Sequence, residues 1–204
     1  TPTEAPASTA PPATAPASTA PPTTAPTEAP AATSAPTEAP AALAPTPACG
    51  DEDDVTIAQT EGPFYTPNTP ERTSLLEPGM PGTRLVVSGT VLTTACQPVA
   101  GALLDFWHAD DSGAYDNAGF RLRGHQFADA QGRYRLETIV PGLYTGRTRH
   151  IHVKVQAPNQ PVLTTQLYFP DEPANARDGI FHPALVMAVR DAADGKEATF
   201  DFVL

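Results

Sequence analysis

Side chains that can bind a metal ion are concentrated between Tyr144 and His152. The apolar, β-branched residues around the two histidines favour a strand, and alternate residues of a strand project from the same face. His150 and His152 are therefore expected side by side. Tyr144 and Tyr115, about thirty residues upstream, can add phenolate oxygens, which are hard anionic donors. Two imidazoles with two phenolates suit Fe(III) better than Zn(II) or Cu(I), so this set predicts a ferric enzyme.

The first 48 residues differ in composition from the rest of the chain. They are almost wholly Thr, Pro, Ala, Ser and Glu, and Pro-Thr-Glu-Ala-Pro recurs at 26–30 and 36–40. Such a segment cannot bury enough apolar surface to offset its backbone entropy, so residues 1–48 are predicted to be a disordered linker or stalk. Stalks of this composition are common on secreted proteins. We therefore expect a secreted or cell-surface protein tethered through the stalk, with a low-complexity tail of no particular role as the alternative.

The remaining residues, 49–204, are enough for one domain with its own core. The formal net charge of the chain is −11, and the three glutamates of the tail leave −8 on the domain. An acidic domain argues against nucleic acid or an anionic membrane surface as a partner. No apolar run approaches membrane-spanning length, so no transmembrane segment is expected. The chain begins at Thr1, and a leader removed from this numbering would agree with export.

The chain has two cysteines, Cys49 and Cys96. Cys49 opens the domain, and Cys96 lies in a turn-like Thr-Thr-Ala-Cys-Gln-Pro stretch. In an exported protein the simplest expectation is an intrachain disulfide that fixes the N-terminus of the domain. Two free thiols are the alternative.

Short apolar segments separated by Gly, Pro and Asp turns predict strands. The candidate strands are 84–93, 103–107, 133–139, 150–156, 162–169 and 198–204. No segment carries a sustained helical stripe, apart from a short turn near 172–177. The expected fold is all-β, an antiparallel β-sandwich preceded by the disordered tail rich in Pro, Thr and Ala.

Part of this pattern also fits a protein without chemistry. Residues 129–136 followed by 140–144 match a widespread non-catalytic surface β-sandwich, the transthyretin-like or carboxypeptidase-regulatory-like module. In that module the aromatic residue after the Pro-Gly turn packs against the fold, so Tyr144 taken alone also fits a packing role. Tyr134 and Trp107 are expected in the core, and His108 in a structural role or one next to the ligands.

Several ordered motifs, taken together, resemble the intradiol ring-cleavage dioxygenases, the non-haem Fe(III) enzymes that include catechol 1,2-dioxygenase and protocatechuate 3,4-dioxygenase. The motifs lie at 60–65, 101–115, 132–135, 140–144, 147–152 and 163–169. The resemblance covers roughly residues 59–204.

This resemblance implies a function for each of the motif residues. Tyr115, Tyr144, His150 and His152 would be the ligands of a non-haem Fe(III) ion. Arg147 and Gln166 would lie beside the substrate ring, with Tyr144 taking a proton from the substrate. Gly62, Pro63 and Phe64 would line the substrate pocket, ordinary packing being the alternative for Phe64.

The implied reaction is the cleavage of a small aromatic diol of the catechol type by O₂, giving a muconate-type dicarboxylic acid. Arg147 would stabilise the negative charge that builds on the ring during oxygen attack. A surface module that had lost the chemistry would be expected to lack at least one residue of the set. All of them are present.

Overall fold

The computed structural model shows the β-sandwich that the C-terminal part of the chain forms. Its described residues are Thr1 and 55–204, so the predicted stalk after Thr1 and the predicted disulfide partner Cys49 lie outside them. Cys96 is disulfide-bonded. Among the described residues, no helix is long and apolar enough to cross a membrane.

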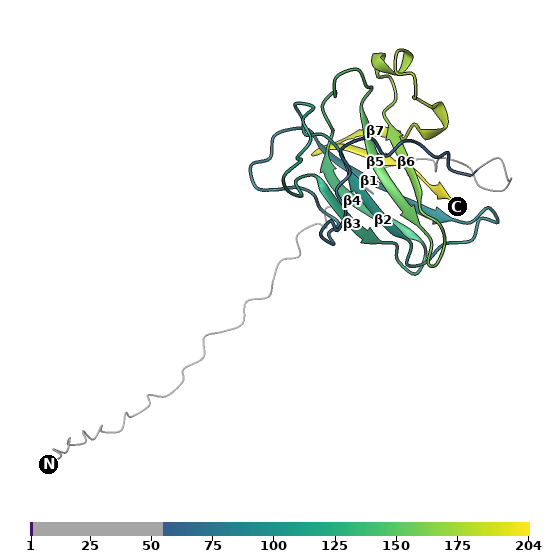
Figure 1. Cartoon of the computed structure of the whole chain (residues 1–204), viewed down its shortest axis with the longest axis horizontal. Helices are drawn as coiled ribbons and strands as arrows, with labels where there is room; N and C mark the ends of the chain where they lie inside the picture. Colours follow the sequence, from purple (N-terminus) through teal and green to yellow (C-terminus); the bar gives the residue numbers. More distant parts are fainter. Residues whose placement is uncertain (2–54) are drawn as a thin grey trace, which may run out of the picture. The chain divides into compact units, whose positions relative to one another are not determined.

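Residues 55–204 form two β-sheets that face each other (Figure 1). One sheet has the order β4-β1-β8-β7, with β9 also paired to β1, and the other has the order β3-β2-β5-β6. The strands are β1 (Arg84–Leu92), β2 (Leu103–Trp107), β3 (Arg123–Phe127), β4 (Arg133–Ile139), β5 (His150–Gln156), β6 (Leu163–Tyr168), β7 (Ala188–Ala192), β8 (Gly195–Thr199) and β9 (Phe202–Val203). Two 3₁₀ turns, η2 (Pro173–Ala176) and η3 (Pro183–Leu185), follow β6 at one end of the sandwich.

The predicted all-β sandwich is confirmed, and β2, β4 and β5 have the predicted bounds. One detail of the prediction is wrong, because β1 runs parallel to β8 and β9 and this sheet is therefore mixed. The predicted strand 198–204 is interrupted between β8 and β9. At the interruption the Asp201 carboxylate accepts a hydrogen bond from the Thr90 N–H at 2.6 Å, in place of a backbone carbonyl. The strands β3 and β7 were not predicted.

The core lies between the sheets and explains the alternation within β5. Ile151, Val153 and Val155 are fully buried in it, together with residues of the opposite sheet such as Leu85 and Leu136. Each such aliphatic side chain contributes about 1.5–3 kcal/mol when it leaves water. The intervening residues of β5 must point to the other face of the sheet, away from the core. The two histidines are on that outer face.

Candidate metal centre

A row of buried residues crosses the outer face of the β3-β2-β5-β6 sheet. Trp107 of β2 is paired in register with Arg123 of β3 and with His152 of β5, and His152 is paired with Gln166 of β6. Residues paired across strands project from the same face. All four are at most 3% exposed, although three of them are polar. Loops therefore cover this face and enclose a polar site.

Three potential donor atoms meet above this row. The Nε2 atom of His150 lies 3.1 Å from Nε2 of His152 and 3.2 Å from the hydroxyl oxygen of Tyr115. Two ligands bound at about 2.1 Å and at right angles to each other are roughly 3 Å apart, so this spacing fits three ligands of one ion. Among residues 55–204 no cluster of three His, Cys, Asp or Glu side chains could hold a metal. Within this region, the two histidines can therefore form a metal site of three or more ligands only together with the tyrosine oxygens.

The two imidazoles are prepared to bind a cation. His150 Nδ1 donates to the Thr148 carbonyl at 2.6 Å, which leaves the lone pair on Nε2 directed at the other donors. Burial lowers the pKa of His150 to about 4 and holds the pKa of His152 well below its ordinary value, so both rings are neutral at pH 7. His152 Nδ1 is buried without a hydrogen-bond partner. Neutral rings with facing nitrogens fit a bound cation.

The two predicted tyrosine ligands lie next to each other. The ring centroids of Tyr115 and Tyr144 are 5.8 Å apart with an interplanar angle of 80°. Burial raises the pKa of the Tyr115 hydroxyl to about 12, although Arg147 and Arg123 act in the opposite direction. Tyr115 is therefore a neutral phenol at pH 7 unless a cation favours the phenolate. A buried phenol that ionises only beside a cation fits the ferric ion predicted from the sequence.

The loops that carry Tyr115 and Tyr144 each have a glycine two positions before the tyrosine. These glycines allow the two loops to pack closely against each other. A Cβ atom on Gly113 would lie 2.2 Å from the Leu143 carbonyl oxygen, and one on Gly142 would lie 2.4 Å from the Asp111 carbonyl oxygen. The Gly142 N–H also donates to the Asp110 carbonyl at 2.7 Å. Backbone contact between the loops thus places the two tyrosines together.

The predicted pocket residues lie against the donors to different degrees. Phe64 stacks on Tyr115 with ring centroids 4.5 Å apart and contacts Tyr144 edge-on at 5.3 Å. A Cβ atom on Gly62 would be 3.5 Å from Cε1 of His152, so this backbone covers the imidazole. Pro63 is exposed. Phe64 therefore both packs the site and borders it.

The predicted pair Arg147 and Gln166 forms a direct contact. Nη2 of Arg147 donates to Oε1 of Gln166 at 2.6 Å, and Nε2 of Gln166 donates to the Thr60 carbonyl at 2.8 Å. Nε of Arg147 forms an ion pair with Asp178 at 2.8 Å. Burial alone would raise the pKa of the Asp178 carboxyl, but hydrogen bonds from Thr148, Ile180 and Arg147 outweigh it and lower the pKa. Asp178 was not predicted from the sequence.

Arg123 is a second residue of the site that the sequence did not reveal. Its guanidinium is 1% exposed and donates to the Asp116 carbonyl at 2.7 and 3.0 Å and to the Phe64 carbonyl at 2.5 Å. It therefore joins the loop that follows Tyr115 to the loop that carries Phe64. Its partners are backbone atoms of distant residues, for which a sequence motif gives no signal.

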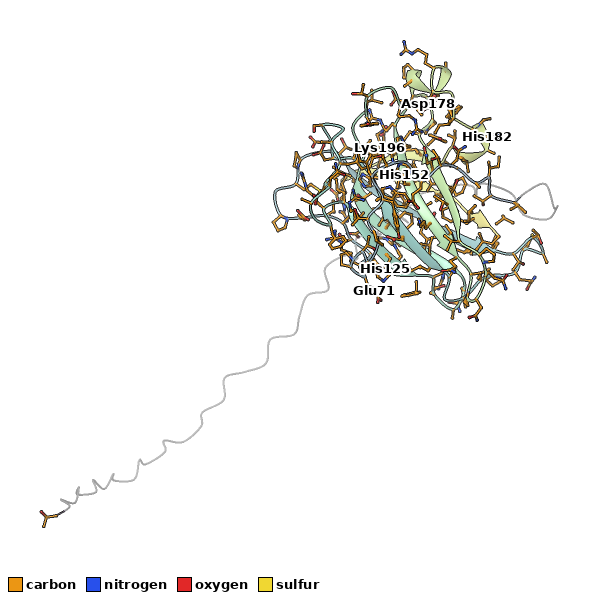
Figure 2. All side chains as sticks on the ribbon, viewed as in Figure 1. Glu71, His125, His152, Asp178, His182 and Lys196 are labelled. Carbon is orange, nitrogen blue, oxygen red and sulfur yellow. The ribbon has the colours of Figure 1, made fainter. Side chains whose placement is uncertain are left out.

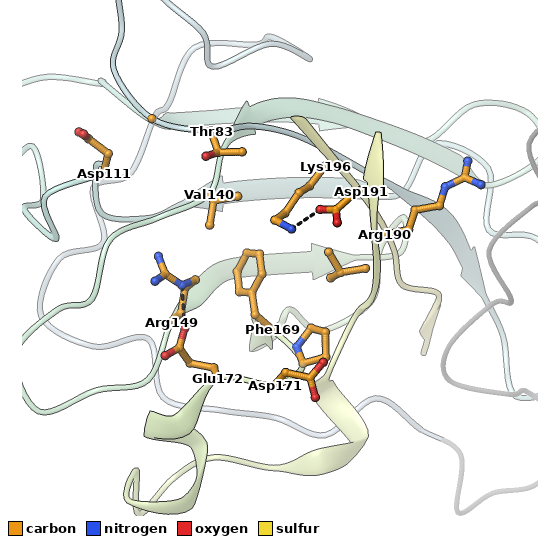
Figure 3. A pocket seen from close by; sticks show the side chains of 13 residues that line it. Thr83, Asp111, Val140, Arg149, Phe169, Asp171, Glu172, Arg190, Asp191 and Lys196 are labelled. Carbon is orange, nitrogen blue, oxygen red and sulfur yellow. Dashed lines mark hydrogen bonds and ion pairs between the residues drawn. The ribbon is translucent and has the colours of Figure 1, made fainter. Parts of the chain in front are cut away.

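Two cavities adjoin this end of the sandwich. A cavity of about 350 Å³ is lined by Tyr115 and His108, among others. A second cavity of about 610 Å³ is lined by Arg149 and by none of the candidate ligands. Four of its charged side chains form two ion pairs, Arg149 with Glu172 at 2.9 Å and Lys196 with Asp191 at 2.5 Å (Figure 3). We assign no chemistry to the second cavity.

The β-sandwich with its cluster of histidine and tyrosine donors has the architecture expected from the resemblance to the intradiol ring-cleavage dioxygenases. Residues 60–204 match the family model Dioxygenase_C, described as a dioxygenase. The chain belongs to the intradiol ring-cleavage dioxygenase family. Members of this family typically use non-haem Fe(III).

Similar proteins support the same family. The chain is 31% identical over 146 residues to a chlorocatechol 1,2-dioxygenase of Pseudomonas sp., covering 59% of this chain and 58% of the relative. It is 36% identical over 118 residues to a protocatechuate 3,4-dioxygenase beta chain of Burkholderia cepacia, covering 49% and 50%. The chain thus spans about half the length of these curated relatives.

A solved structure covers most of the β-domain. It is the dioxygenase domain of a dioxygenase carbohydrate-binding protein fusion from a cellulolytic Streptomyces. The two are 62% identical with a TM-score of 0.73, and the match covers 74% of this chain and 98% of that one. A 3-chlorocatechol 1,2-dioxygenase of Rhodococcus opacus is 27% identical with a TM-score of 0.68, covering 72% and 71%.

Proposed function

We propose that this protein is a non-haem Fe(III) intradiol dioxygenase that cleaves catechol-type aromatics with O₂ to muconate-type dicarboxylic acids. The observation that carries the proposal is that His150 Nε2 lies 3.2 Å from Tyr115 Oη and 3.1 Å from His152 Nε2. Tyr144 lies beside them as the fourth proposed ligand. Family membership supports the same chemistry.

The proposed ligands suit the ferric ion for a reason of charge. Two phenolates offset most of the 3+ charge, and two neutral imidazoles complete the set without adding more. The ion, when bound, polarises a coordinated catechol so that its ring reacts with O₂. The protein's part is to bind the diol in one orientation, to accept its protons and to stabilise charge on the ring.

Each of these tasks has a proposed residue. Phe64 packs on Tyr115 and would border the bound ring on one side. The phenolate oxygen of Tyr144 would accept one of the diol protons, while Tyr115 remains a ligand. The Arg147 guanidinium, fixed by Gln166, would stabilise the negative charge that develops as O₂ attacks.

We also propose that the enzyme acts outside the cell, on small catechols released from lignin or plant phenolics. The composition of residues 1–48 supports a tether at the cell surface. The similar Streptomyces domain belongs to a fusion with a carbohydrate-binding protein in a cellulolytic bacterium. This supports the proposal that the present enzyme acts on aromatic compounds close to plant polymers.

The proposal is tested with the full chain loaded with Fe(III). Tyrosinate-to-iron charge transfer should colour the protein red-brown, and the colour should change when catechol is added without oxygen. With oxygen-18 gas, both atoms of O₂ should appear in the product. A panel of catechol, hydroxyquinol, protocatechuate and chlorocatechols, analysed by mass spectrometry, would rank the substrates.

Tyr134→Phe provides a matched control for colour and activity. Tyr134 is also a buried tyrosine, but its hydroxyl donates to the Phe200 carbonyl at 2.7 Å on the core side. Its loss should lower stability by about 1 kcal/mol and leave the iron in place. A colourless, inactive wild-type protein that contains stoichiometric Fe(III) would refute the proposed function.

A further inference from the structure

The segment after β6 carries a buried carboxylate outside every motif that predicted the site. The side chain of Asp178 is 3% exposed, and it lies in the segment of the 3₁₀ turns at one end of the sandwich (Figure 2). Burying a charge is costly unless hydrogen bonds and an opposite charge compensate it. Asp178 has both kinds of partner, and they lead to the candidate metal centre.

One oxygen of this carboxylate fixes the arginine proposed to act on the substrate. Oδ2 of Asp178 accepts a hydrogen bond from Nε of Arg147 at 2.8 Å. The Nη2 atom of the same guanidinium donates to Gln166 at 2.6 Å. Two bonds to different atoms of a planar group determine both its position and the direction of its plane.

The same oxygen also fixes the backbone that orients a proposed ligand. Oδ2 accepts the Thr148 N–H at 2.9 Å, and the Thr148 carbonyl in turn accepts from Nδ1 of His150 at 2.6 Å. The Thr148 hydroxyl donates to Asn175 of the same segment at 2.6 Å. The backbone before His150 is therefore held by the segment that carries Asp178.

Oδ1 anchors the carboxylate itself. It accepts the Ile180 N–H at 3.1 Å, so both oxygens of Asp178 are used. Asparagine has a single acceptor oxygen and no charge, so it cannot replace all of these bonds. The position requires an aspartate specifically.

We propose that Asp178 is a positioning residue of the oxygenase site, which sets the Arg147 guanidinium and, through Thr148, the ring of His150. The inference rests on the roles proposed above for Arg147 and His150. Partners that orient a ligand or a reacting group from outside the site typically change metal affinity or activity by about 10- to 100-fold when they are lost.

The same segment offers a matched control. Arg149, which immediately precedes His150, pairs with Glu172 at 2.9 Å, and the Glu172 side chain is 14% exposed. Asp178→Asn and Glu172→Gln therefore each remove the carboxylate charge that pairs with an arginine within three residues of His150. The Arg149–Glu172 pair lines the second cavity, which none of the candidate ligands lines (Figure 3).

The first measurement is turnover of catechol per bound iron in the full chain. Asp178→Asn should lower it by about 10- to 100-fold, whereas Glu172→Gln should leave it within about twofold of wild type. In an Arg147→Ala background, Asp178→Asn should have a smaller effect on turnover, because the arginine that it positions is gone and only its path through Thr148 to His150 remains. Equal turnover of both carboxylate variants, or a full additional loss in the Arg147→Ala background, would overturn the proposal.

The second measurement does not depend on turnover. In the metal-free full chain, proton exchange of the Arg147 Nε–H with water is followed by nitrogen-15 NMR, with the signal assigned by its loss in Arg147→Ala. Exchange should be at least about tenfold faster in Asp178→Asn than in wild type or Glu172→Gln, since the accepting charge is gone. If the wild type cleaves no catechol, the proposed function fails and this exchange alone decides the role of Asp178. Unchanged exchange would refute it.

Discussion

Trp107 lies flat against His152, with ring centroids 4.8 Å apart and an interplanar angle of 7°. The contact follows from the pairing of the two residues across β2 and β5. A metal-binding histidine is usually oriented by a hydrogen bond from its second ring nitrogen, but His152 Nδ1 has no such partner. The indole therefore fixes the plane of the imidazole, so Trp107 is buried as predicted but packs on the site face of β2 and not between the sheets.

Trp107→Leu should consequently weaken iron binding. Leucine keeps an apolar side chain but cannot hold the ring plane, and we expect about 10-fold or greater loss of Fe(III) affinity in competition with a chelator. Phe106→Leu is the control, since Phe106 is fully buried in the core on the opposite face of β2. It should lower the melting temperature without changing iron affinity. Equal affinities in the two variants would contradict the role of Trp107.

Removal of a proposed ligand should remove the iron. His152→Ala and Tyr115→Phe each delete one of four protein donors, so we expect loss of both bound iron and visible colour. Metal analysis and the absorption spectrum after desalting measure this directly. Retention of full iron content in either variant would show that the residue is not a ligand.

Gly142→Ala should separate the two tyrosine loops. The added methyl group would meet the backbone of Asp111 and Gly113 at 2.4 Å, and neither can move without shifting its loop. We expect a stability loss of about 1–3 kcal/mol together with weaker iron binding. Gly146→Ala in the same loop meets no atom within 4 Å and has φ +79°, so it should cost roughly 1 kcal/mol of backbone strain and leave iron binding nearly unchanged. Calorimetry and chelator competition compare the two variants.

His108 should make the domain less stable in mild acid than at neutral pH. His108 Nδ1 donates to the Ala109 carbonyl at 2.7 Å, and Nε2 accepts from the Thr138 hydroxyl at 2.7 Å, so the folded state holds the ring neutral. Burial lowers the pKa of His108 to about 4, whereas the unfolded chain binds the proton near pH 6.5. The stability that the neutral His108 ring contributes is therefore complete above pH 6.5 and is lost as the pH falls to about 4.

The size of this effect is on the order of 3 kcal/mol. It is measured as the free energy of unfolding of metal-free protein from pH 7 to 4, for wild type and His108→Gln. The difference between the two curves should favour wild type less and less as the pH falls through this window. A difference that stays constant would contradict the assignment.

Deletion of residues 1–48 should leave turnover and melting temperature nearly unchanged. Every proposed site residue lies within 60–204, the region that matches the family, and the deletion retains Cys49 for its predicted bridge to Cys96. A fall of several degrees in the melting temperature would show that the deleted segment stabilises the domain.

The sequence predicted the strands whose apolar residues alternate and missed those that lack this pattern. β2, β4 and β5 supply the core from one face, so their bounds are evident. β3 contains the polar run Arg123-Gly-His-Gln, and β7 forms the end of its sheet, so neither shows a clear apolar period.

The site residues could be predicted for a different reason, because histidine and tyrosine are recognisable as metal ligands from their residue type and spacing. His150 and His152 were recognised from their spacing on one strand, and the structure brings them within 3.1 Å of each other. Asp178 and Arg123 were not recognised, because they act on backbone atoms of distant segments. Such partnerships depend on tertiary folding and leave no local pattern.

The parallel pairing of β1 with β8 and β9 determines when this domain can close during its synthesis. β1 pairs with β4 on one edge, but on its other edge its neighbours are residues 195–203, more than a hundred positions later. Until the ribosome has released them, one edge of β1 and the apolar core beneath it stay uncovered, and contacts this distant in sequence form slowly. The core of the domain therefore cannot close around β1 until β8 and β9 have both emerged from the ribosome.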